Sequence, residues 1–246
     1  MSSIPPDQPE SRNQSATDLS DRELVFSWVL VRNFGQYAPG LHQKCAGIPK
    51  DAESAVGYIY IDHDTGISMK IEGILSNNGH DLKKNTLVSL EDVVSLRFRY
   101  SSLKSMDLTP LSGEQVQHLG LPQMPGWARL YETPDLAFIR SFGWLDPLRA
   151  HGFFDDVMAV LPAKKGDVPE FIWVRLSRYI PKTDRFSAIL LNEPFRDYGI
   201  HRSDSLEVQV ARNRGGISLI VRHEKVLPGE TAGEHSAGKS PENGDA

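Results

Sequence analysis

The chain has 246 residues, of which 39% are hydrophobic and 24% charged, and its formal net charge is −5 at pH 7. This length and composition are typical of a globular protein of one or two domains with a buried core. The acidic balance disfavours nucleic acid as a partner, because nucleic-acid binders usually present a basic face. The single cysteine, Cys45, excludes an intrachain disulfide and suits a reducing compartment, so we expect a cytoplasmic protein.

Both ends of the chain are polar. Residues 1–21 and 227–246 are rich in Ser, Pro, Asp, Asn and Gly, and they lack the apolar residues that offset the entropy cost of ordering. We expect two disordered tails, and the first has neither the basic nor the apolar region of a signal peptide. The longest apolar stretch, Leu24–Val31, is far shorter than the roughly 20 residues that span a bilayer, so no membrane association is expected.

Between the tails, apolar residues recur at every second position, which is typical of β-strands with one buried and one solvated face. The first module is expected over residues 22–145. Its expected elements are a strand over Glu23–Val31, a hairpin over Val56–Leu75 that turns at Asp62–Gly66, a strand over Asp92–Tyr100, and a short helix around Ser112–Leu119 that Ser112 caps and Gly120 ends.

The second module is expected over residues 146–226. A helix should begin with Asp146 as its N-cap and Pro147 at its first position, and Gly152 should end it. An antiparallel meander of four or five strands should follow, with Ile172, Val174 and Leu176 on its buried face. The sequence therefore predicts an α+β fold that consists mostly of antiparallel β-meanders with a few short helices.

The two halves also share an order of features. In each, a hairpin ends in Ile-Leu and an asparagine follows closely, Asn77 in the first half and Asn192 in the second. One interpretation is that the chain contains two similar β modules with a binding cleft between them. The alternative is that hairpins with polar tips resemble one another.

The C-terminal stretch resembles a group of small uncharacterised bacterial domains with the pattern W-V-x-V, L-x-N-x-P and G-D-x-V. The matching segments are Trp173–Leu176, Leu190–Pro194 and Ser203–Leu206, and Ser203 departs from the usual Gly. The resemblance covers about Val157–Val210. It implies a compact α+β domain, and some members of the group are candidate toxin-immunity proteins. It implies no catalytic residue.

One strand face carries the candidate binding residues. Trp173, Arg175 and Tyr179 alternate along one predicted strand, and mixed aromatic and Arg side chains are typical of protein interfaces as well as of solvated sheet faces. Asn192 is a further candidate, although an Asn before Pro194 also shapes a turn. We expect a non-catalytic bacterial protein-binding module, of immunity or regulatory type, with no cofactor and no metal.

Two other functions remain open at this point. His151, Asp155 and Asp156 lie close together in the sequence and could supply a general base with an orienting acid, so an enzyme with a site between the two modules is the alternative. A nucleic-acid module is disfavoured by the total charge, but arginines concentrate in the last third of the chain. They are Arg196, Arg202, Arg212, Arg214 and Arg222.

Overall fold

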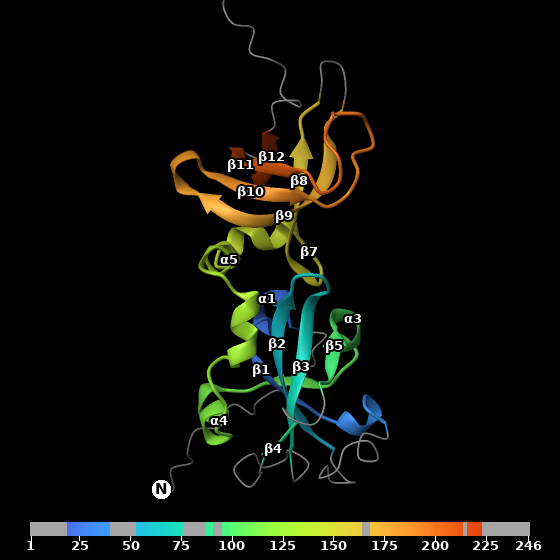
Figure 1. Ribbon diagram of the computed structural model, residues 1–246, viewed down its shortest axis with the longest axis vertical. Coiled ribbons are helices and arrows are strands. Elements are labelled where there is room, and N and C mark those ends of the chain that lie inside the picture. Colours follow the sequence, from blue (N-terminus) through green and yellow to red (C-terminus); the bar gives the residue numbers. More distant parts are fainter. Residues whose placement is uncertain are drawn as a thin grey trace, which may run out of the picture.

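The computed structural model describes residues 19–39, 53–75, 87–90, 95–163, 168–213 and 216–222, and it shows two β modules stacked along the long axis of the molecule (Figure 1). Of these residues 44% lie in strands and 23% in helices, so the predicted β-rich fold with few helices is confirmed. No helix in this part of the chain combines the length and the apolar character that crossing a bilayer requires.

The first module is an antiparallel sheet, sheet A, in the order β4-β3-β2-β1-β6, with β5 pairing against β3. The predicted hairpin over Val56–Leu75 is confirmed as β2 and β3 with a turn between Asp62 and Gly66. The strands are β1 (Trp28–Val31), β2 (Ala55–Asp62), β3 (Gly66–Leu75), β4 (Leu87–Ser89), β5 (Arg97–Arg99) and β6 (Leu108–Pro110).

The central strands β1 and β2 of sheet A are buried on both faces, so the expectation of one solvated face is wrong for them. One face packs aliphatic side chains such as Val29, Ile59 and Ile71 into a core. The other face carries aromatic residues, and the 3-10 helix η4 (Gly126–Tyr131) covers it. The Tyr60 ring meets the Trp127 ring edge-on at 4.8 Å between centroids. The alternation along β2 is therefore between two kinds of buried residue, not between apolar and solvated ones.

Helix α1 (Asp21–Leu24) corrects two expectations about the N-terminal region. Ser20 and Glu23 form a reciprocal capping box, which starts a helix where a strand was expected from Glu23. Leu19 is buried at 6% exposure in the core of sheet A, so the predicted disordered tail does not extend through residues 19–21. Two further helices belong to this module: α3 (Tyr100–Leu103) and α4 (Gly113–His118). In α4 the predicted Ser112 cap is confirmed.

The second module is a five-stranded barrel whose strands follow one another in chain order. The predicted meander is confirmed, and β12 pairs in parallel with β8 through Ile220 and Val160. Since consecutive strands of a meander alternate in direction, the first and fifth run the same way, and closure between them must be parallel. The strands are β8 (Phe153–Leu161), β9 (Glu170–Ile180), β10 (Arg185–Leu190), β11 (Ser205–Asn213) and β12 (Gly216–Arg222), with β7 (Arg149–Ala150) beside β8.

The barrel interior is filled by side chains from all five strands. Ile172, Val174 and Leu176 are 0–1% exposed, which confirms their predicted orientation. Helix α5 (Pro134–Arg140) and the 3-10 helix η5 (Gly143–Leu148) contribute Ile139 and Leu145 to this core. These two elements therefore pack with the barrel, although the predicted module limit at residue 145 separates them from it. Asp146 lies inside η5, which is followed by β7, so the predicted α-helix from Pro147 to Gly152 is absent and Asp146 caps none. Its carboxylate instead accepts from Arg22 and Arg149.

Polar and aromatic contacts join the two modules. The N–H of Ile67 in β3 donates to the Gly152 carbonyl at 2.7 Å, and the N–H of Gly152 donates to Asp21 at 2.9 Å. Phe154 in β8 packs into the core of sheet A, with the Arg149 guanidinium 4.1 Å from the centre of its ring. The junction is therefore built from a strand of one module inserted into the core of the other.

The proposed similarity between the modules is partly visible in strand order. Four consecutive strands form a meander in each module, β1 to β4 and β8 to β11. The strand that follows pairs differently, since β6 is antiparallel to β1 whereas β12 is parallel to β8. Asn77 lies outside the described residues, so its match with Asn192 is not observed, and the duplication stays a prediction.

Replacing Phe154 with Ala should lower the free energy of unfolding by about 3–5 kcal/mol, because the change removes a buried ring and leaves a cavity at the junction. Phe195→Ala is the matched control, since Phe195 is 93% exposed, and it should change stability by less than about 0.5 kcal/mol. Urea denaturation of both variants measures the difference. Equal shifts in the two variants would show that Phe154 does not hold the modules together.

Candidate functional site

The outer face of the barrel carries apolar side chains in neighbouring rows. Cross-strand partners point to the same side of a sheet, so the pairs Ile220 with Val160 and Val160 with Phe171 form one row. Met158 and Trp173 form the next. Phe171, Trp173 and Ile189 are 62%, 40% and 42% exposed. We call this surface the apolar strip, and it consists of Met158, Val160, Phe171, Trp173, Ile189 and Ile220.

Two further exposed apolar residues lie in the loops beside the start of β9. Val168 is 67% exposed and Phe195 is 93% exposed. The carboxylate of Glu170 accepts the N–H of Phe195 at 2.5 Å, and Arg196 donates to the Val168 carbonyl at 2.9 Å. The loop that presents Phe195 is therefore fastened to the start of β9. Contiguous exposed apolar residues are uncommon on soluble monomers and mark interaction surfaces.

The loop after β10 fixes the edge of the strip. Asn192 accepts the N–H of Trp173 at 2.7 Å with its side-chain oxygen, so its role is to hold the chain against β9. Glu193 binds the His201 ring at 2.6 Å and the N–H of Arg202 at 2.9 Å. The hydrogen bond to Glu193 raises the pKa of His201. Ser203, in the same loop, has a φ of 77°, which lies in the left-handed region that favours glycine.

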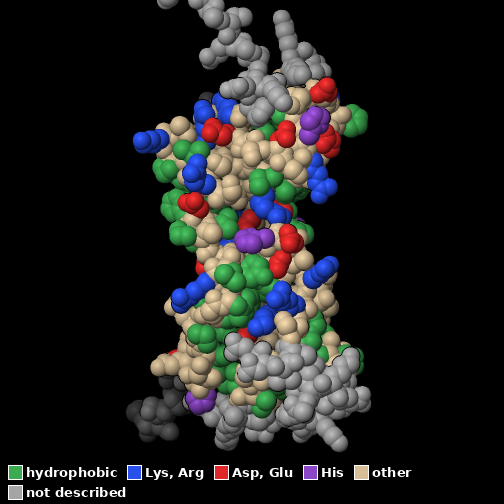
Figure 2. Space-filling view, viewed as in Figure 1, with side chains coloured by type: hydrophobic (Ala, Val, Ile, Leu, Met, Phe, Trp, Pro, Cys, Tyr) green, Lys and Arg blue, Asp and Glu red, His purple; other side chains and the backbone are tan. Residues whose placement is uncertain are grey.

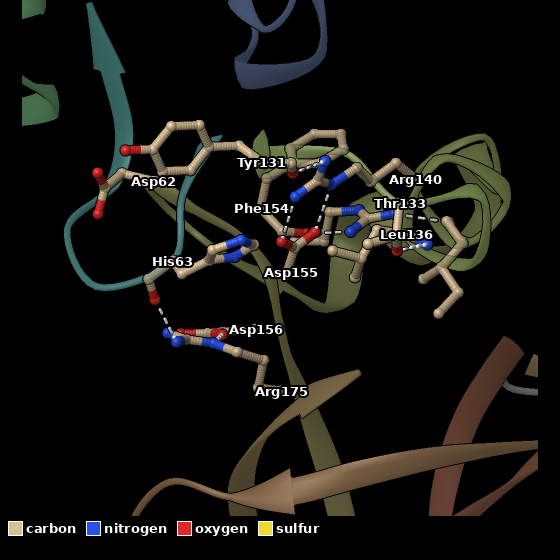
Figure 3. A network of polar contacts seen from close by, with 12 residues as sticks. Asp62, His63, Tyr131, Thr133, Leu136, Arg140, Phe154, Asp155, Asp156 and Arg175 are labelled. Carbon is tan, nitrogen blue, oxygen red and sulfur yellow. Dashed lines mark hydrogen bonds and ion pairs between the residues drawn. The ribbon is translucent and has the colours of Figure 1, made fainter. Parts of the chain in front are cut away.

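Arg175 stands at the end of the strip nearest sheet A. Its guanidinium donates to Asp156 at 2.6 and 3.0 Å and also to the carbonyl of His63 in the β2–β3 turn (Figure 3). The hydrogen bond to Asp156 raises the pKa of Arg175. This predicted binding residue therefore connects the strip to the other module.

Tyr179 is not on the outer face, so its predicted alignment with Trp173 and Arg175 is wrong. The pairing register between β9 and β10 shifts by one residue between Ser187 and Ala188. This β-bulge reverses which face of the sheet the next residues of β9 point to. Tyr179 pairs with Phe186, which is fully buried, and their rings lie 4.9 Å apart. A one-residue bulge is not visible in the alternation of the sequence.

The residues of the enzyme alternative lie at the junction of the modules. Asp155 and Arg140 form a buried pair, with both carboxylate oxygens accepting from the guanidinium at 2.7 and 2.8 Å. Asp156 is held by Arg175, whereas His151 is exposed and contacts neither carboxylate. Charged and His side chains gather at the narrow waist in the face shown in Figure 2. The two arginines that these carboxylates bind reach the other module, because Arg140 also donates to the Tyr131 carbonyl and Arg175 to the His63 carbonyl.

A small hollow lies beside this network. It encloses about 170 Å³, including open solvent, and its polar lining residues are Asp62, His63, Asp155, Asp156 and Arg175. The carboxylates of Asp155 and Asp156 already bind guanidinium groups (Figure 3). Across the described ranges, no three His, Cys, Asp or Glu side chains gather in a way that could hold a metal ion.

The described arginines of the nucleic-acid alternative lie on β11, on β12 and in the loop after β10, and a carboxylate pairs with one of them. Arg212 pairs with Asp184 at 2.8 Å, Arg222 donates to Gln209 at 2.8 Å, and Arg196 donates to a backbone carbonyl. Arg202 is exposed, and Arg214 lies outside the described residues.

Sequence reasoning missed two features of this region. Arg140 is 4% exposed and also donates to the Tyr131 carbonyl at 2.9 Å, but nothing in the spacing indicates its pairing with Asp155. The exposure of Phe195 could have been predicted from the sequence. It directly follows a turn proline and belongs to no alternating strand, so no pattern directs its side chain into a core.

Comparisons of the chain with family models, with curated proteins and with solved structures found no match. The function is therefore argued from the geometry of the barrel and of the junction.

Replacing Asp155 with Asn should cost about 3–5 kcal/mol of stability, because the Arg140 charge is left buried without a full partner. The double variant Arg140→Met, Asp155→Asn should lose less stability than the sum of the losses in the two single variants, Arg140→Met and Asp155→Asn. Urea denaturation of the four proteins gives the coupling. Arg212→Met is the control, since its exposed ion pair should contribute less than about 1 kcal/mol. Additive single changes would contradict the buried pair.

Replacing Ser203 with Gly should stabilise the chain by about 0.5–1 kcal/mol. Glycine adopts the left-handed conformation without steric cost, and this gain exceeds the entropy that a glycine adds to the unfolded chain. Thermal unfolding measures the shift. Ser205→Gly in β11 is the control and should destabilise, because glycine weakens a strand. A lower melting temperature for Ser203→Gly than for the unchanged chain would show that the backbone of Ser203 is not strained.

Proposed function

We propose that this chain is a non-catalytic protein-binding module, of regulatory or immunity type, in the bacterial cytoplasm, and that its partner docks on the apolar strip. The observation that carries the proposal is the exposure of Phe171, Trp173 and Ile189 on the outer face of β9 and β10. Large aromatic side chains are enriched at protein interfaces, and Trp in particular provides much of the binding energy there.

The rigidity of the surface supports this function. The strip lies on strands of a closed barrel, and Arg175 fastens it to the other module through Asp156 and His63. A surface that keeps its shape before binding loses little conformational entropy on association. The backbone of Trp173 is fixed in particular, since its N–H donates to the side-chain oxygen of Asn192.

The junction carboxylates support binding over catalysis. A general base needs a lone pair directed at substrate. Asp155 and Asp156 direct their oxygens at Arg140 and Arg175, and His151 stands apart from both. The enzyme alternative therefore lacks the arrangement of side chains that it requires.

Photo-crosslinking from the strip tests this function. With p-benzoylphenylalanine at position 171, the chain should crosslink to one protein of the source cytoplasm, and the added change Trp173→Ala should remove the product. The same photo-reactive residue at position 130 is the control, because Leu130 is 78% exposed but lies in η4 of the other module.

The identity of the product decides between outcomes. A crosslink to a different protein that depends on Trp173 supports the proposal. A crosslink between two copies of this chain would show that the strip is a dimer interface instead. Equal products from positions 171 and 130, or products insensitive to Trp173→Ala, would overturn the proposal. Unchanged thermal unfolding of Trp173→Ala is required, so that loss of the product is not loss of the fold.

A further inference from the structure

A row of arginines crosses the outer face of the barrel beside the apolar strip. Arg178 pairs with Ser187, Ser187 with Glu207, and Glu207 with Arg222, so these side chains project from the same side of four strands. Arg185 lies two residues from Ser187 and donates to Glu207 at 2.9 Å. We call this surface the arginine row, and it consists of Arg178, Arg185, Ser187, Glu207 and Arg222.

The arginine row carries an excess of positive charge. It holds three guanidinium groups and a single carboxylate, that of Glu207, which Arg185 already binds. Arg222 donates to the uncharged side chain of Gln209 at 2.8 Å. Arg178 is exposed, and no carboxylate of the described residues pairs with it. This excess stands out in a chain whose formal net charge is −5.

The β-bulge in β9 produces this arrangement. Leu176 faces the interior, and strict alternation from it would turn Arg178 inward as well. The extra residue at the bulge leaves both Ser177 and Arg178 exposed, and the Ser177 hydroxyl donates to the Ser187 carbonyl at 3.1 Å. The bulge thus places a guanidinium on the outer face and turns Tyr179 toward the core, where its ring is partly buried.

The arginine row and the apolar strip adjoin at two points of the barrel. On β12, Arg222 lies two residues from Ile220 of the strip, and on β10, Ser187 lies two residues from Ile189. A two-residue step along a strand is about 7 Å. A single bound segment of a few residues can therefore reach both surfaces.

We propose that the arginine row binds Asp and Glu side chains of the same partner segment whose large apolar residues bind the strip. The inference rests on the proposed function and specifies the chemistry of the partner. A guanidinium presents a planar fork of N–H donors that matches a carboxylate with two hydrogen bonds. An acidic peptide with a neighbouring aromatic or aliphatic residue complements both the charge and the apolar area of this surface.

Selection of random peptides displayed on phage, with the full chain as bait, tests the inference. Enriched peptides should carry an aromatic or large aliphatic residue with Asp or Glu within a few positions. The variant Arg178→Glu, Arg222→Glu should bind a synthetic peptide of that consensus at least about tenfold more weakly, because attraction becomes repulsion. Arg99→Glu, Arg129→Glu is the matched control, since it makes the same change of charge at two exposed residues of the other module and should bind normally.

Each result separates the two proposals. Enriched peptides that are apolar but not acidic, with binding lost only in Trp173→Ala, would overturn the role of the arginine row and leave the proposed function standing. No enrichment over a blank bait would overturn both. Binding of a fluorescent single-stranded or double-stranded oligonucleotide that Arg178→Glu, Arg222→Glu abolishes would assign the row to phosphate groups, and it would overturn a peptide as its ligand.

Discussion

The strands of the barrel turn alternate residues inward and outward, and five strands enclose a space that their inward side chains fill. Closure at β12 and β8 leaves the interior of the barrel no room for a ligand, because Ile172, Val174, Phe186 and their neighbours occupy it. The outward residues therefore provide the surface for recognition. The apolar strip and the arginine row are both consequences of which residue types the sequence places at outward positions, and of the one bulge that changes the alternation.

The junction with sheet A holds one end of this outer surface in place. Phe154 inserts into the core of sheet A, and Arg140 and Arg175 bind the two adjacent carboxylates of β8. Two of the side chains that looked like a catalytic group in the sequence, Asp155 and Asp156, thus hold the arginines that donate to Tyr131 and His63 of the other module. Buried ion pairs of this kind contribute little net stability, but removing one partner is costly, which favours a single arrangement of the modules.

Much of the fold could be predicted from local patterns. The alternation around Ile172 identified the inner face of β9, and Ser112 with Gly120 marked the limits of α4, because strand period and helix caps are properties of neighbouring residues. The pairing of Arg140 with Asp155 and the parallel closure of the barrel join segments that the chain brings together only on folding, so spacing could not reveal them. Helix α1 was missed although Ser20 and Glu23 have the spacing of a capping box. Tyr179 was assigned to the wrong face because nothing in the amino-acid sequence of β9 reveals the bulge that reverses the alternation before it.

The parallel seam between β8 and β12 has a consequence for the order of events during synthesis. Strand β8 leaves the ribosome before its last neighbour, Gly216–Arg222, has been translated, so the nascent meander carries unpaired edges until that segment arrives. During this interval the interior side chains of four strands lack part of their cover, and such intermediates are prone to aggregate. The barrel is therefore closed by contacts between its first and last strands, which the chain can form only after its final strand has been made.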